Sequence, residues 1–133
     1  KKYFELGNLK AKRDWGHAKD YIEGMWKLLQ YKRPTDMVFA TGQTHSVEEF
    51  LIECLDILKI KYKKKIDKGI TFFIDKSNNK LICKTNKRYY RPNEVHYLKG
   101  NAKLAKKVLK WKPKFTFKSL VKEMINSEFG KRN

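Results

Sequence analysis

Apolar residues recur at helical spacing in two long segments of the chain. Between residues 17 and 31 they repeat every three or four positions, with charged residues between them, which predicts an amphipathic helix. Arg33-Pro34 follows, and proline disfavours a helical conformation at the residue before it, so we expect the helix to stop there. A second apolar stripe begins after Ser46, which is spaced from Glu49 as in a capping box. The sequence therefore predicts a second helix that begins at Ser46.

Short continuous apolar runs predict strands. Residues 2–6 are expected to form the end of a strand, and residues 37–40 a strand covered on both faces. Residues 70–74 and 81–84 indicate two strands joined by a polar turn. Residues 61–65 carry four lysines and are ambiguous, but the charges fit a solvated sheet edge, where they discourage aggregation.

The order of elements predicts the fold class and a domain boundary. Two further helices are expected at residues 101–109, capped by Asn101, and at residues 117–129. The order strand, helix, buried strand, helix, hairpin, helix, helix predicts an α/β arrangement followed by a more α+β one. We expect residues 1–44 to be the last elements of a parallel sheet and residues 45–133 to be a smaller domain. Open α/β sheets bind ligands at the carboxyl ends of their strands, which places a site near this boundary.

Composition narrows the class of protein. Hydrophobic residues make up 41% of the 133 residues, enough for a core, and no apolar run is long enough to predict a membrane span. The net charge of +18 raises nucleic acid as an alternative partner, but nearly all of it is scattered lysine, whereas phosphate-reading surfaces concentrate arginine. Cys54 and Cys83 have no neighbouring ligand pattern, so we expect reduced thiols, with no disulfide and no metal site. The chain begins with lysine and shows no signal-peptide pattern, so we expect a fragment of a longer cytoplasmic protein.

Two separated arginines are the candidate ligand-binding residues. Arg13 lies in a predicted loop between a strand and a helix, and Arg91 precedes a proline that biases it toward an extended conformation. Guanidinium groups suit phosphate oxygens, and the carboxylate of Glu94 can accept hydrogen bonds from a ribose diol. The alternative for Arg91 and Glu94 is a surface ion pair of little energetic weight.

The residues beside Arg13 are interpreted separately. Asp14 is expected to pair with a neighbouring backbone or an arginine, and Trp15 and His17 are expected to serve packing and the start of the helix. Asn8 and Lys12 can either read the edge of a purine base or be ordinary loop polar residues, and the residues alone leave this open.

Four segments resemble the GDP-mannose 4,6-dehydratases, a family of extended short-chain dehydrogenase/reductases. Residues 6–21 read LGNLKAKRDWGHAKDY, and residues 40–50, 89–95 and 109–113 fit the same family. The Asn-Lys-Arg run with its Trp-Gly-His tail is more specific than the Arg-Pro element, which many nucleotide-sugar epimerases and dehydratases share. An epimerase or dehydratase acting on a different nucleotide sugar is therefore the alternative within this class.

The resemblance implies a fold, an activity and a set of site residues. It implies that residues 1–44 end a Rossmann-type NAD(P)-binding domain and that residues 45–133 form the substrate-binding domain. The implied enzyme uses bound NADP to convert GDP-mannose to GDP-4-keto-6-deoxymannose, a first step towards GDP-fucose, and is a homo-oligomer (dimer or tetramer). The resemblance implies that the diphosphate is bound by Arg13 and Arg91 and the ribose by Glu94. It places Asn8 and Lys12 near guanine.

The catalytic part of this family is not expected in the chain. None of the seven glycines belongs to a glycine-rich dinucleotide fingerprint, and no tyrosine is followed four positions later by lysine. We therefore expect no catalytic residue here, NADP to be bound mainly by another part of the enzyme, and this chain to be inactive by itself.

Overall fold

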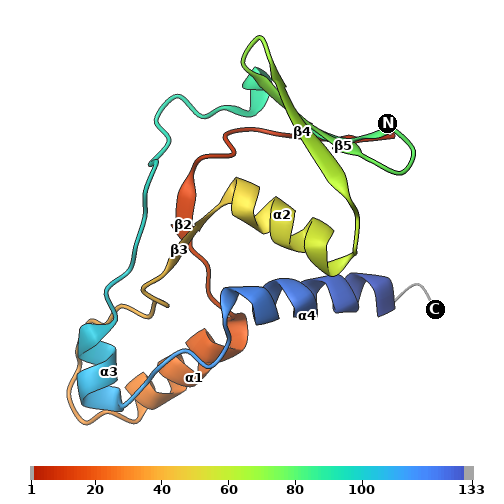
Figure 1. Cartoon of the computed structure of the whole chain (residues 1–133). Helices are drawn as coiled ribbons and strands as arrows, with labels where there is room; N and C mark the ends of the chain where they lie inside the picture. Colours follow the sequence, from red (N-terminus) through yellow and green to blue (C-terminus); the bar gives the residue numbers. More distant parts are fainter. Residues whose placement is uncertain (1, 131–133) are drawn as a thin grey trace. The chain divides into compact units, whose positions relative to one another are not determined.

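The computed structural model describes residues 2–130, which form two compact units, each built from two separate stretches of chain (Figure 1). The first unit combines the residues up to Ala11 with Ser46–His96, and the second combines Lys12–His45 with the residues from Tyr97 onward. The chain therefore passes between the units three times, whereas the sequence predicted a single boundary near residue 45. The assignment of residues 1–44 to a nucleotide-binding domain and of residues 45–133 to a substrate domain stays a prediction.

The first unit contains a four-stranded mixed sheet. Its strands are β1 (Phe4–Leu6), β4 (Tyr62–Asp67), β5 (Ile70–Asp75) and β6 (Leu81–Thr85), in the order β1-β6-β5-β4. β1 runs parallel to β6, while β4, β5 and β6 are antiparallel neighbours. The predicted hairpin and the predicted strand at residues 2–6 are confirmed.

The core of the first unit lies between the sheet and α2 (Val47–Ile57). The capping box predicted for this helix is present, since the Ser46 backbone N–H donates to Glu49 Oε2 (2.5 Å) and the Glu49 N–H donates to Ser46 Oγ (3.1 Å). Leu51 and Leu55 of the helix pack with Phe73 and with Cys83 of the sheet. Cys54 and Cys83 are free thiols as predicted, and burial raises the pKa of Cys83 to about 11.

β4 confirms the interpretation of the lysine-rich segment. This strand lies at one end of the strand order, and Lys63, Lys64 and Lys65 are exposed. An ammonium group on each of these residues discourages a second chain from pairing with the open strand edge.

The second unit contains a small sheet and three helices. Its strands β2 (Lys12–Asp14) and β3 (Thr44–Ser46) pair with each other, and its helices are α1 (Ala18–Leu29), α3 (Lys103–Leu109) and α4 (Phe117–Gly130). The helices predicted at residues 17–31 and 117–129 are confirmed. Asn101 accepts a hydrogen bond from the Lys103 N–H (3.1 Å), although the residue at the N-cap position of α3 is Ala102.

Two predictions for the second unit are wrong. Residues 12–14 are a short strand, not a loop, because β3 supplies a pairing partner from a distant part of the sequence. Residues 37–40 are not a strand: Ala40 is buried, but the Val38 side chain is 54% exposed. An apolar run becomes a covered strand only between neighbouring strands, and no strand of residues 2–130 pairs with this one.

The apolar stripe of α1 is also largely exposed within the part of the chain that the structure describes. Ile22, Met25, Trp26 and Leu29 expose more than half of their surface, and Leu29 is 81% exposed. The opposite side of the helix is packed, since a Cβ at Gly24 would lie 2.7 Å from the ring of Phe39. Periodicity therefore predicted the helix, but most of its apolar face is not part of the core described here.

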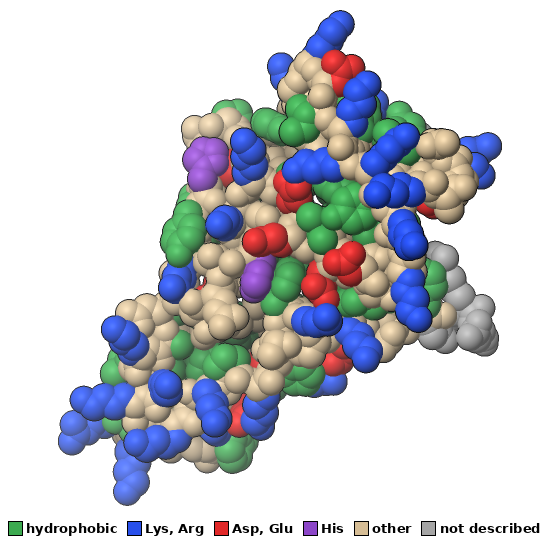
Figure 2. Space-filling model, in the orientation of Figure 1, with side chains coloured by type: hydrophobic (Ala, Val, Ile, Leu, Met, Phe, Trp, Pro, Cys, Tyr) green, Lys and Arg blue, Asp and Glu red, His purple; other side chains and the backbone are tan. Residues whose placement is uncertain are grey.

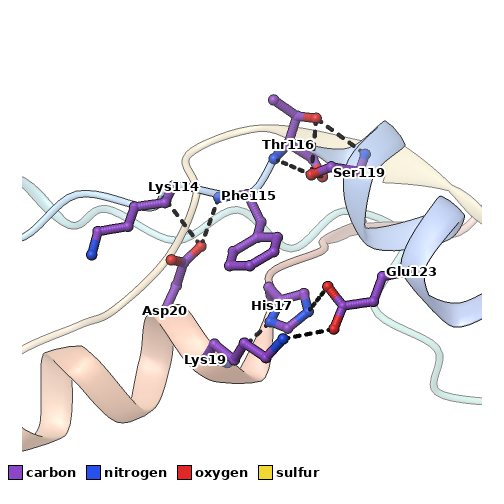
Figure 3. Close-up of polar contacts among 8 residues, drawn as sticks. All are labelled: His17, Lys19, Asp20, Lys114, Phe115, Thr116, Ser119 and Glu123. Atoms are coloured by element: carbon purple, nitrogen blue, oxygen red, sulfur yellow. Dashed lines mark hydrogen bonds and ion pairs between the residues drawn. The ribbon is translucent and has the colours of Figure 1, made fainter. Parts of the chain in front are cut away.

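The Asp20 side chain joins α1 to the C-terminal stretch. It is 2% exposed, and its Oδ2 accepts hydrogen bonds from the backbone N–H groups of Lys114 and Phe115 (3.0 Å each; Figure 3). The Asp20 carbonyl oxygen accepts a further bond from Trp111 Nε1 (2.8 Å). The turn that leads into α4 is thus fixed to the first turn of α1.

The Asp14 side chain joins three stretches of the second unit. Its Oδ1 accepts from the backbone N–H and the hydroxyl of Thr41 (2.8 and 2.6 Å). Its Oδ2 accepts from the N–H groups of Gly42 (2.8 Å) and Gly100 (3.3 Å). This confirms the prediction that Asp14 pairs with neighbouring backbone.

Among residues 2–130, no helix is both long enough and apolar enough to cross a membrane.

We expect Asp14→Asn to loosen the two backbone segments that Asp14 joins. The amide would present an NH₂ group to backbone donors that now share two carboxylate oxygens, and charged hydrogen bonds contribute about 1.5–3 kcal/mol each. Hydrogen-exchange mass spectrometry on the full-length protein should show exchange around Thr41-Gly42 and Gly100 accelerated roughly 30-fold or more, which corresponds to about 2 kcal/mol.

Asp36→Asn is the matched control, because Asp36 is exposed and the substitution removes the same charge. Equal protection of both segments in the Asp14 variant and in the control would contradict the role given to Asp14.

Candidate functional site

Three of the predicted binding residues line one hollow of the first unit. Asn8, Arg91 and Glu94 all contribute to a cavity of about 500 Å³. That volume is within the range of small-molecule sites, about 300–1,000 Å³. Residues that are more than 80 positions apart in the sequence are therefore gathered by the fold of this unit.

Gly7 allows the two sides of this hollow to approach. A Cβ at Gly7 would lie 2.5 Å from the carbonyl oxygen of Tyr89, so a larger residue would force apart the end of β1 and the short 3-10 helix η1 (Lys87–Tyr89). The Asn86 N–H donates to the Leu6 carbonyl oxygen (2.8 Å) and holds the same junction. Asn8 follows directly on one side of the junction, and the segment that carries Arg91 follows on the other.

The backbone that leads from η1 to Arg91 is extended. Tyr90 ends the 3-10 helix with an extended conformation (φ −76°, ψ 133°), and Pro92 restrains the next step of the chain. The Arg91 side chain is exposed, while Glu94 is half-buried. An exposed guanidinium beside a partly desolvated carboxylate can bind a phosphate and a hydroxyl-bearing group at the same time.

Charges of both signs line the hollow. Lys64 and Glu48 form an ion pair at its wall, and Lys10 and Arg91 add two further cations. Within residues 2–130, Arg91 forms no ion pair. The guanidinium is therefore available to an anionic ligand.

The sheet contributes lining residues that the sequence interpretation did not identify. Thr71 and Thr85 lie on neighbouring strands and line the hollow, and the Thr71 N–H donates to Thr85 Oγ1 (2.9 Å). Thr85 directly follows the predicted strand 81–84, so its place at a strand end was a usable signal. Lys64 lay in the segment whose pattern was ambiguous.

Lys12 and Arg13 belong to the second unit. Arg13 lines a smaller hollow of about 330 Å³ there, together with Asp14, Tyr21 and Phe39, and its Nη1 donates to the Lys12 carbonyl oxygen (2.8 Å). Lys12 is exposed on β2. That both arginines hold one diphosphate stays a prediction.

Trp15 and His17 have the structural roles that were predicted. Trp15 Nε1 donates to the His45 carbonyl oxygen (2.9 Å). His17 is the N-cap of α1: its Nδ1 accepts from the Lys19 N–H (3.1 Å), so Nε2 carries the proton that faces Glu123 Oε2 (3.2 Å; Figure 3). Hydrogen bonding to Lys19, with a smaller contribution from His17, lowers the pKa of Glu123.

The sequence matches the family model described as GDP-mannose 4,6 dehydratase over residues 1–124. The chain is 47% identical over 123 residues to a GDP-mannose 4,6 dehydratase of Dictyostelium discoideum, a match that covers 90% of this chain and 34% of that protein. It is 46% identical over 127 residues to the Homo sapiens protein of the same name, covering 94% of this chain and 34% of the relative. The chain thus spans about a third of the length of the curated relatives it matches.

Solved structures agree on the fold. The chain superimposes on RMD from Pseudomonas aeruginosa, complexed with NADPH, with a TM-score of 0.73 at 17% identity, covering 99% of this chain and 37% of that one. It superimposes equally well on a UDP-glucose 4-epimerase from Thermotoga maritima with UDP-glucose, at 13% identity and with 98% and 36% coverage. These similarities confirm the predicted fold class, a mixed α/β chain like the C-terminal portion of a Rossmann-type enzyme.

The specific run at residues 6–21 and the Arg-Pro segment thus occur in a chain whose whole pattern fits one enzyme family. The chain belongs to the GDP-mannose 4,6-dehydratase family.

Proposed function

We propose that this chain binds GDP-mannose as part of an enzyme that converts it to GDP-4-keto-6-deoxymannose, towards GDP-fucose. The observation that carries the proposal is the hollow of the first unit, where Arg91, Glu94 and Asn8 meet in a chain of this family. A cation, a carboxylate and an amide at one cavity are the groups that a nucleotide sugar needs for its phosphates, ribose and base.

Each residue has a defined role in the proposal. Arg91 binds the diphosphate, Glu94 accepts hydrogen bonds from the ribose hydroxyls, and Asn8 lies near guanine. Arg13 provides a second guanidinium for the diphosphate, and Lys12 a second polar contact near the base. Support for these two comes from the family match over residues 6–21, because they lie in the other unit.

The chain would contribute to catalysis by positioning the substrate. Binding energy from the diphosphate and ribose, remote from the reacting hexose, can be used to hold the sugar in a reactive orientation. The chain offers no catalytic residue of its own in this proposal, and we expect it to be inactive without the remainder of the enzyme.

The residues of this chain do not fit the nicotinamide cofactor. The sequence has neither a glycine-rich fingerprint nor a Tyr-x-x-x-Lys pair, so we assign no NADP contact and derive no step through the cofactor. NADP is proposed as the cofactor of the whole enzyme, bound mainly by its other part. The nicotinamide-binding fold of the family supports a cofactor of this kind.

A cytoplasmic homo-oligomer, a dimer or tetramer, completes the proposal. Free thiols at Cys54 and Cys83 support a reducing compartment. The oligomeric state rests on the resemblance to extended short-chain dehydrogenase/reductases.

We expect Arg91→Ala to weaken GDP-mannose binding to the full-length enzyme by about 1.5–3 kcal/mol, roughly 10- to 150-fold in Kd, because a charged hydrogen bond to the diphosphate is lost. Isothermal titration calorimetry measures this directly. Arg88→Ala is the matched control, since Arg88 is also exposed, is three residues away and does not line the hollow.

An unchanged Kd in the Arg91 variant would contradict the proposed contact between Arg91 and the diphosphate. Equal weakening in both variants would show that net charge, and not Arg91 itself, determines affinity.

The identity of the base is tested separately. We expect GDP-mannose to raise the melting temperature of the full-length enzyme more than UDP- or dTDP-sugars at equal concentration, because the ligand that binds the folded state more tightly stabilises it more. Thermal-shift titrations with the three ligands measure this. Stabilisation by a UDP- or dTDP-sugar, but not by GDP-mannose, would contradict the proposed substrate and would indicate an enzyme that acts on another nucleotide sugar.

A further inference from the structure

A second hollow of the second unit is lined by lysines. Its volume is about 550 Å³, and Lys99, Lys103, Lys106 and Lys112 all contribute to its wall. None of its lining residues is an aspartate or a glutamate. The hollow of the first unit, in contrast, is lined by Glu48 and Glu94 as well as by cations.

The backbone that carries this lysine hollow is held in place. The carboxylate of Asp14 accepts hydrogen bonds from Thr41, Gly42 and Gly100, all of which line the hollow. Gly100 also permits a close approach, since a Cβ there would lie 2.1 Å from that of Ala40. The walls are therefore formed before a ligand arrives, which lowers the entropic cost of binding.

The four lysines are concentrated and unpaired. Lys103 and Lys106 lie three positions apart on α3, a spacing that places side chains on the same face of a helix. Within residues 2–130, none of the four lysines forms an ion pair. Lysines elsewhere in the same unit do: Lys114 pairs with Glu23 (2.6 Å), and Lys19 with Glu123 (2.9 Å).

Figure 2 shows lysine and arginine side chains gathered over the end of the second unit that carries α3, at the lower left of the view. Like charges that line one hollow repel one another, and a bound anion relieves that repulsion. The Asp14 carboxylate does not line this hollow, and it already accepts hydrogen bonds from three backbone N–H groups and from the Thr41 hydroxyl.

We propose that the lysine hollow binds a small molecule that carries a phosphate or diphosphate group. Ammonium groups from Lys99, Lys103, Lys106 and Lys112 would bind the phosphate oxygens. Ala40, Trp111 and Pro113 give the same hollow an apolar wall against which an uncharged part of the ligand can pack. Its volume accommodates a ligand of nucleotide size.

The inference goes beyond the proposed function. Lys103, Lys106 and Lys112 line neither the hollow with Arg91 nor the one with Arg13, whereas Ala40, Lys99 and Gly100 also line the hollow with Arg13. The Arg91→Ala variant therefore provides a background in which the proposed substrate site is weakened and the lysine hollow is intact.

Titration calorimetry with inorganic pyrophosphate at physiological ionic strength tests the proposal on the full-length protein carrying Arg91→Ala. We expect Lys103→Gln/Lys106→Gln to weaken pyrophosphate binding at least tenfold, because two charged hydrogen bonds are lost. The matched control is Lys107→Gln/Lys122→Gln. It removes the same charge from exposed helical positions of the same unit that do not line the hollow, and it should change the affinity by less than twofold.

Three results would overturn the proposal. The first is the absence of pyrophosphate binding up to millimolar concentration before the lysines are changed. The second is equal weakening in the two double variants, which would mean diffuse attraction by the net charge of +18. The third is binding of single-stranded RNA, but not of pyrophosphate, that depends on Lys103 and Lys106; this would make the surface a nucleic-acid site.

Discussion

Four hydrogen bonds from Thr41, Gly42 and Gly100 converge on the carboxylate of Asp14. These donors come from two stretches of chain that are nearly 60 residues apart, and Asp14 lies on a third. Asp20 acts in the same way a few residues later, on the backbone that leads into α4. Buried backbone donors need acceptors, and a carboxylate satisfies several at once. The second unit therefore depends on two acidic side chains in a chain that has few of them.

The distribution of charge gives the abundant lysines three different surroundings. Lys63 and Lys65 are exposed on the edge strand β4 and protect it, whereas Lys19, Lys64 and Lys114 pair with carboxylates. Around the lysine hollow they gather without a carboxylate in the lining. Total charge describes none of these differences, because each depends on which side chains the fold brings together. The lysine hollow and the hollow with Arg91 consequently differ in the charge of their linings, the first wholly positive and the second mixed.

Features determined by neighbouring residues could be predicted from the sequence. Three such local features are present: the capping box of Ser46 and Glu49, the hairpin formed by β5 and β6, and the amphipathic period of α1. The strand predicted at residues 37–40 and the loop predicted at Arg13 depended on distant pairing partners, which periodicity does not contain. The residues of the candidate site show the same difference between local and long-range features. Arg91 and Glu94 could be identified from a short motif, whereas Thr71 and Thr85 join them only through the register of a sheet.

The interleaving of the two units has a consequence for synthesis. As the chain leaves the ribosome, β2 and α1 emerge before α3 and α4, but Asp20 of α1 accepts hydrogen bonds from the N–H groups of Lys114 and Phe115. The second unit therefore cannot close until Lys114 and Phe115 have been translated, while the first unit, complete at His96, can close earlier. Long-range closure of this kind slows folding and prolongs the exposure of apolar surface. During that interval the rings of Tyr21 and Phe39 lack Trp111, against which they pack in the folded unit, and they are the apolar surface most vulnerable to aggregation.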